Sequence, residues 1–186
     1  MKNIFLFFFS LLITLLAIAG CDSQNSIDNP ITVSPQKDNS VSNGDDILSK
    51  CGRNTTLRRQ LIKVKSATAK YHSIKKADKD GYKDIDVIIP HMGWHYLKKD
   101  LLDDTFDFEK PELLVYAPDR HGMLRLVAVE YAIPGDENTV PPEAFAGSDD
   151  VWDYADGLWT LHTWIWYYNP DGIFAPFNPR VNFTLN

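Results

Sequence analysis

A glutamate and a histidine that stand within apolar runs are the side chains in this sequence best suited to chemistry. Glu130 alternates with Leu124, Leu126, Ala128 and Ala132, and His162 opens an aromatic row of the same spacing, formed by Trp164, Trp166 and Tyr168. Alternate residues of a strand share one face, so both polar side chains are expected to be buried. A carboxylate in such a position is costly unless it is paired, hydrogen-bonded or bound to a metal.

His95 is the third candidate, because Gly93 just before it lets the backbone approach another element closely. We therefore expect His95, Glu130 and His162 to form one buried polar cluster. Two imidazoles and a carboxylate are donors for zinc, copper or iron, and the same groups could serve as a general acid and base in a hydrolytic enzyme. A third interpretation is a structural or interaction protein in which they only stabilise the core. The row of Trp164, Trp166 and Tyr168 is then either core or a wall for a ligand.

The amino terminus has the pattern of a bacterial lipoprotein signal. Lys2 precedes an apolar stretch from Ile4 to Ile18, and the small pair Ala19-Gly20 stands before Cys21. The stretch is shorter than the roughly 20 residues that span a membrane, which disfavours an uncleaved anchor. We expect cleavage of residues 1–20 and lipid attachment at Cys21, and hence a palmitate-bearing protein of the bacterial cell envelope outside the cytoplasm. Asp22 resembles a signal for retention in the inner membrane.

Residues 21–50 are predicted to be a flexible tether, and residues 51–186 a single domain. The tether is rich in Ser, Asn, Asp, Gln and Pro and lacks aromatic residues, so it buries too little apolar surface to become ordered. With Cys21 blocked by lipid, Cys51 is the one remaining thiol. That count excludes an internal disulfide and a cysteine-based zinc site.

Charge is distributed unevenly along the chain. The whole sequence carries a formal net charge of −6, which disfavours nucleic-acid binding. Between Arg53 and Lys79, however, the sequence contains nine basic residues and one acidic residue, Asp78, which gives a local charge of +8. This basic helix is expected to meet anionic lipid or an acidic partner, in addition to the membrane reached through the lipid anchor.

The fold predicted from the periodicity is α+β, with one long amino-terminal helix packed on an antiparallel sheet and an irregular, proline-rich tail. Thr55 or Thr56 is expected to cap the helix, which ends near Gly81 and has an apolar stripe of Leu57, Leu61, Val64, Thr68, Tyr71 and Ile74. Strands are predicted at 84–89, 112–117, 123–133 and 158–168, with a hairpin turn at 118–122 and an irregular segment at 134–157.

Three motifs carry a resemblance to a known family: Met92-Gly93-Trp94-His95, Val129-Glu130-Tyr131, and the stretch from His162 through Asn169-Pro170 to Asn178-Pro179. Over about residues 57–181 the chain resembles a family of uncharacterised bacterial secreted or lipid-anchored proteins. The resemblance implies that His95, Glu130 and His162 occupy positions that the family also fills with these residues, unlike His72, His91 and His121. It implies no activity.

Overall fold

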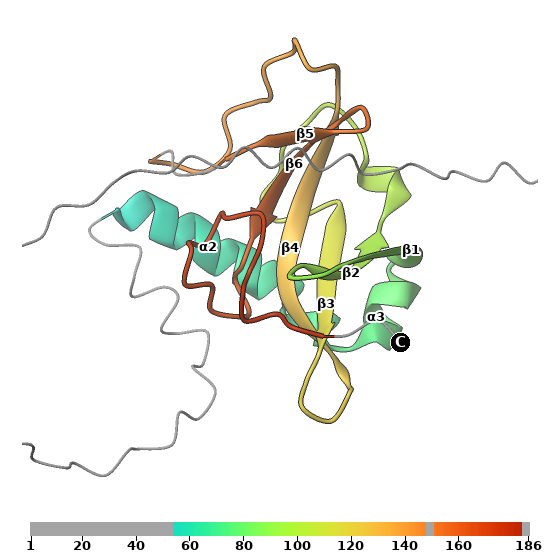
Figure 1. The fold of residues 1–186 in the computed structure, drawn as a ribbon. Coiled ribbons are helices and arrows are strands. Elements are labelled where there is room, and N and C mark those ends of the chain that lie inside the picture. Colours follow the sequence, from blue (N-terminus) through green and yellow to red (C-terminus); the bar gives the residue numbers. More distant parts are fainter. Residues whose placement is uncertain (1–53, 148–150, 184–186) are drawn as a thin grey trace, which may run out of the picture. The chain divides into compact units, whose positions relative to one another are not determined.

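The domain is an α+β fold, as predicted, in which a helical segment covers one face of a curled antiparallel sheet (Figure 1). The computed structural model describes residues 54–147 and 151–183, so the predicted signal, Cys21 and the tether lie outside the described residues. The strand order is β1-β2-β3-β4-β6-β5. The strands are β1 (Lys83–Ile89), β2 (Gly93–Leu97), β3 (Leu113–Pro118), β4 (Leu124–Pro134), β5 (Asp153–Ala155) and β6 (Leu158–Thr163). Among the described helices, none is both long and apolar enough to cross a membrane.

The predicted helix is interrupted, and its cap lies one residue earlier than predicted. Asn54, not Thr55 or Thr56, caps α2 (Thr55–Thr68), because its side-chain oxygen accepts the Leu57 N–H at 3.0 Å. The chain continues as η1 (Ala69–His72), and the extended backbone of Ser73 separates this turn from α3 (Ile74–Lys79). A further short helical turn, η2 (Lys99–Leu101), follows β2.

The main core lies between this helical segment and one face of the sheet. Leu61 and Val64 of α2 pack with alternate residues of the central strands, namely Leu114, Tyr116, Val129, Tyr131 and Leu161. A smaller apolar cluster lies on the opposite face and contains Val115, Ala128, Trp164 and Val181. The alternation therefore assigns the two faces of the sheet, and the residues between the main-core positions face away from α2.

The tail from Asn169 to Val181 has no regular strand, as predicted, and two buried asparagines hold it in place. The amide of Asn169 donates to the Phe177 carbonyl at 2.8 Å, and the amide of Asn178 donates to the Tyr168 carbonyl at 3.1 Å. The two bonds are reciprocal, because Phe177 precedes Asn178 and Tyr168 precedes Asn169 in the chain. The Asn178 N–H also donates to the His91 carbonyl at 2.8 Å, which ties the tail to the start of β2.

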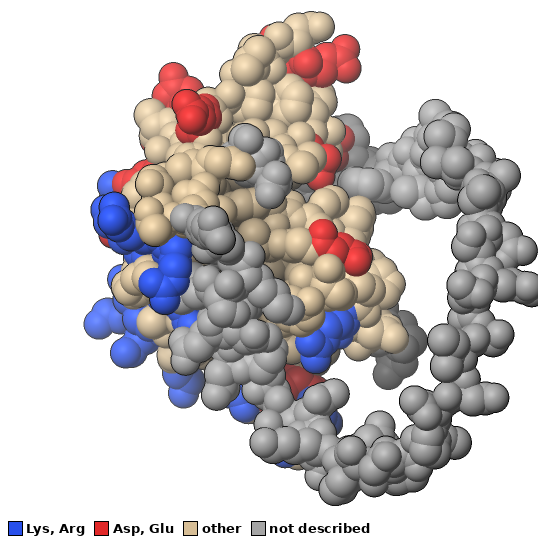
Figure 2. All heavy atoms as spheres, turned by 90° about the vertical axis from the view of Figure 1, so that its left-hand side faces the viewer, with Lys and Arg blue, Asp and Glu red and all other residues tan. Residues whose placement is uncertain are grey.

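Charged side chains are segregated on the surface. Figure 2 shows Lys and Arg gathered over one part of the face that includes α2, and Asp and Glu mostly over another part. The basic residues of α2 are Arg58, Arg59, Lys63 and Lys65, and the helix contains no acidic residue. The charge segregation expected from the sequence is therefore also a segregation in space.

Candidate metal centre

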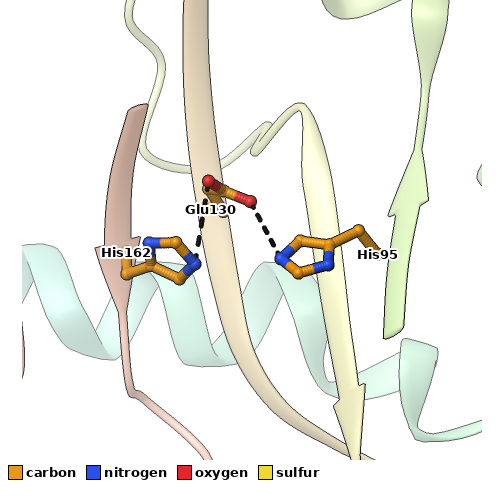
Figure 3. A group of neighbouring side chains, drawn as sticks. All are labelled: His95, Glu130 and His162. Carbon is orange, nitrogen blue, oxygen red and sulfur yellow. Dashed lines mark ion pairs between the residues drawn. The ribbon is translucent and has the colours of Figure 1, made fainter. Parts of the chain in front are cut away.

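His95, Glu130 and His162 lie together on the sheet face that points away from α2 (Figure 3). The Nε2 atom of His95 is 3.5 Å from Oε2 of Glu130, and the Nε2 atom of His162 is 3.7 Å from Oε1 of the same carboxylate. All three residues are buried, with exposed fractions of 2%, 6% and 4%. One ligand atom from each lies within 4.8 Å of the other two.

The curl of the sheet brings these side chains together. His95 is on β2 and His162 is on β6, with β3 and β4 between them. In a flat sheet three strand spacings would separate the backbones by about 14 Å. The ring centroids are 6.2 Å apart. The side chains therefore converge on the concave side, and Glu130, whose register partner on β6 is His162, stands between the rings.

A bulge in β1 orients the His95 ring. The β1–β2 register shifts between Asp84 and Ile88, and Asp86 takes a left-handed conformation with φ 57°. The Val87 carbonyl in this bulge lies 3.0 Å from Nδ1 of His95. Because a carbonyl can only accept, Nδ1 carries a proton that it donates to Val87, and Nε2 is the nitrogen that faces Glu130. Bulges commonly re-aim side chains in this way, and a hydrogen bond from the second ring nitrogen is typical of metal-bound histidines.

The polar atoms of the cluster do not satisfy one another. Both N···O separations exceed the 2.7–3.2 Å of a normal hydrogen bond. The Nε2 atom of His162 is buried and has no hydrogen-bond partner within the described part of the chain. Burial is also the main cause that lowers the pKa of His162, and the His95 ring adds to it, whereas Glu130 and Asp153 oppose it. His162 is therefore neutral near pH 7, the state in which an imidazole binds a metal.

The donor set and its spacing fit a divalent transition metal. Bond lengths of 2.0–2.1 Å around a tetrahedral zinc place neighbouring ligand atoms about 3.3 Å apart. The 3.5 and 3.7 Å separations in the cluster are close to that value. A cation between the three groups would also neutralise the buried Glu130 carboxylate and give His162 Nε2 the partner that it lacks. His95, Glu130 and His162 would then hold the ion.

The prediction that Trp164, Trp166 and Tyr168 form one row with His162 is wrong, because β6 ends at Thr163. Trp164 remains beside the cluster and stacks on His162 with ring centroids 6.2 Å apart. Trp166 lies in the main core on the other side, where its indole donates to Thr68 Oγ1 at 3.1 Å. Tyr168 lies near Arg180 in the tail. Of the three predicted wall residues, Trp164 is the one that lines the cluster.

A second bulge, in β4, makes the surroundings of Glu130 differ from those predicted. The β3–β4 register moves from Val115↔Ala128 to Tyr116↔Leu126, which leaves Val127 as an extra residue. Leu126 consequently packs in the main core, whereas Ala128 belongs to the cluster on the Glu130 face. Strict alternation through the whole strand assigned Leu124 and Leu126 to the wrong face.

Asp153 is an acidic neighbour of the site that the sequence interpretation missed. Its register partner is Thr160, and residues 160 and 162 share a face, so Asp153 is the diagonal cross-strand neighbour of His162. Burial raises the pKa of Asp153, the Glu130 carboxylate raises it further, and His162 lowers it. Asp153 falls in the segment predicted to be irregular, and the three-residue length of β5 leaves no periodic signal.

The remaining histidines lie away from the cluster. His72 is exposed, and its ring contacts the Trp166 ring edge-on with centroids 4.3 Å apart. His91 is exposed in the turn before β2, and His121 is exposed in the β3–β4 loop.

Comparison of the chain with protein-family models, with curated proteins and with solved structures found no match.

Proposed function

We propose that this domain binds a divalent transition-metal ion through His95, Glu130 and His162. The observation that carries the proposal is the convergence of three buried ligand atoms within 4.8 Å, one of which, Nε2 of His162, has no other partner in the described structure. Two imidazoles and one carboxylate favour zinc or iron(II), with copper a further candidate. Binding is favoured over hydrolysis because a substrate would have to reach a carboxylate that is 6% exposed.

The test is metal content and metal-dependent stability of the full chain. The protein should contain close to one equivalent of metal after purification without chelator, and adding the same metal to chelated protein should raise the melting temperature. Binding to the native state alone contributes about 2.7 kcal/mol when free metal exceeds the dissociation constant 100-fold. His162→Ala should abolish this gain. His121→Ala, a change at an exposed histidine, should retain it.

A different result would identify the structural alternative. If the melting temperature of the wild type is indifferent to zinc, copper and iron(II) while Glu130→Ala still unfolds early, the cluster stabilises the core and the metal proposal is wrong. Glu130→Ala would then be destabilised by roughly 1–3 kcal/mol, the cost of leaving buried polar groups unsatisfied.

We also propose that the domain acts at a membrane, held there by lipid on Cys21. The support is the lipoprotein-like run that ends in Ala19-Gly20-Cys21. Lipid forms a thioether with the cysteine sulfur, so Cys21→Ser should leave an unprocessed precursor that takes up no radiolabelled palmitate. Cys51→Ser is the matched control and should be processed and labelled like the wild type. Labelling of the Cys21→Ser variant would contradict the anchor.

A further inference from the structure

The outward side of α2 is a compact basic surface with an apolar residue at its centre. We define the α2 basic face as Arg58, Arg59, Ile62, Lys63 and Ser66. All five side chains are exposed, and Ile62 is 37% exposed. Helical spacing places them on one side, opposite the buried Leu61, Val64 and Thr68.

The cations of this face are not neutralised within the described fold, although Lys63 Nζ lies 5.3 Å from the centroid of the Phe108 ring. Within residues 54–147 and 151–183, Arg58, Arg59 and Lys63 form no ion pair, whereas Lys70 pairs with Asp80 at 2.7 Å. Arg58 and Arg59 lie near the amino-terminal end of α2, whose first turn contains no acidic residue. Positive side chains are unfavourable at that end of a helix dipole. Their charge is therefore available to an external anion.

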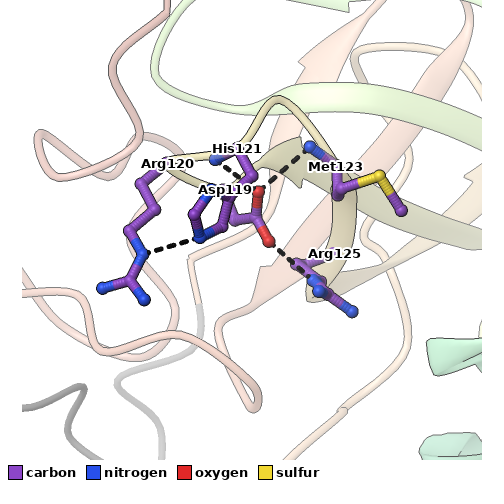
Figure 4. A network of polar contacts seen from close by, with 5 residues as sticks. All are labelled: Asp119, Arg120, His121, Met123 and Arg125. Carbon is purple, nitrogen blue, oxygen red and sulfur yellow. Dashed lines mark hydrogen bonds and ion pairs between the residues drawn. The ribbon is translucent and has the colours of Figure 1, made fainter.

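The loop between β3 and β4 provides a contrast. Asp119 accepts hydrogen bonds from the backbone N–H groups of His121 and Met123 and from Nε of Arg125 at 2.9 Å (Figure 4). These donors lower the pKa of Asp119 to about 2. Arg125, near the start of β4, is thus neutralised by the adjoining loop. The cations of the α2 basic face have no such carboxylate partner among the described residues.

We propose that the α2 basic face docks on the anionic headgroups of a lipid bilayer, with Ile62 at the acyl boundary. Basic residues around an apolar one are the pattern of helices that lie in a membrane interface. A nucleic acid fits less well, because the chain as a whole carries a net charge of −6. α2 is also the first described element after the predicted anchor site, so this face is the part of the domain nearest in sequence to Cys21.

The experiment measures amide hydrogen exchange of residues 55–68 in the full chain reconstituted in vesicles. Exchange should be slower in vesicles with phosphatidylglycerol than in pure phosphatidylcholine, and 0.5 M salt should remove the difference. Each basic residue close to an anionic surface contributes about a fivefold gain in partitioning. The triple change Arg58→Glu, Arg59→Glu and Lys63→Glu should therefore abolish the protection.

The matched control reverses the same number of charges away from α2, at the exposed Lys75, Lys79 and Lys99, which form no ion pair within the described residues. It should keep the lipid-dependent protection. Equal exchange in the two kinds of vesicle would overturn the proposal, and so would equal loss in both triple variants. Metal content, measured on the same samples, reports separately on the His95 site and is expected to be unchanged in both variants.

Discussion

Glu112 is a second buried carboxylate, and it lies outside the candidate metal centre. It is 3% exposed and accepts a hydrogen bond from the Ala132 N–H at 3.0 Å. Burial raises the pKa of Glu112 from 4.5 to about 7, although this hydrogen bond opposes the change. The folded protein therefore binds a proton at Glu112 more tightly than the unfolded chain does.

This difference predicts that Glu112 makes the protein less stable as the pH rises. Between pH 4.5 and about 7 the folded state holds the extra proton, so its contribution to stability is lost across that window. Glu112→Gln keeps a hydrogen-bond acceptor and removes the titration. Relative to the wild type, its free energy of unfolding should improve by at most about 3 kcal/mol from pH 4.5 to pH 8 in urea titrations. Parallel pH profiles of the two proteins would show that Glu112 stays ionised in the fold.

At the scale of elements, the sequence located the strands with long apolar runs and missed the short ones. The runs at 112–117 and 123–133 are β3 and β4 within one residue at each end, and the predicted hairpin between them is confirmed. β2 has five residues and β5 has three, too few for an alternating pattern to be distinguished. The helix prediction ran past Ser73 because the apolar spacing continues to Ile74 although the backbone turns.

Gly93 is essential to the position of β2. It has φ +135°, and a Cβ atom there would lie 2.2 Å from the Tyr116 carbonyl oxygen on β3. The sequence expectation that this glycine permits a close approach is confirmed.

Gly93→Ala should destabilise the fold by at least about 2 kcal/mol, because it adds both a clash and backbone strain. Gly122→Ala is the control, since Gly122 also has a positive φ, of +74°, but has open space around it. Chemical denaturation of the two variants separates the clash from the strain. A similar loss in both would mean that β2 can move away from β3 at little cost.

At the scale of the whole molecule, the sequence indicated which residues form the buried cluster of the candidate site but not how they meet. Burial of Glu130 and His162 was predicted from their apolar neighbours, and His95 was added because Gly93 precedes it; each is a local property of the sequence. Their convergence depends on the curl of the sheet and on the β1 bulge at Asp86, and both arise from long-range strand pairing. Asp153 lies beside them because β5 pairs with β6, and no local sequence pattern predicted this pairing.

The paired asparagines of the tail also bear on when the candidate site closes during folding. Asn178 bonds both to Tyr168 and to the carbonyl of His91, and the segment between them bonds Trp164, whose ring stacks on His162. The wall of the candidate site beside His162 thus depends on residues that follow all three candidate ligands in the chain. A chain synthesised only as far as His162 has the three ligands but lacks this wall. Any ion bound at the candidate site would therefore be enclosed only after the segment between the two asparagines has packed against Trp164 and His91.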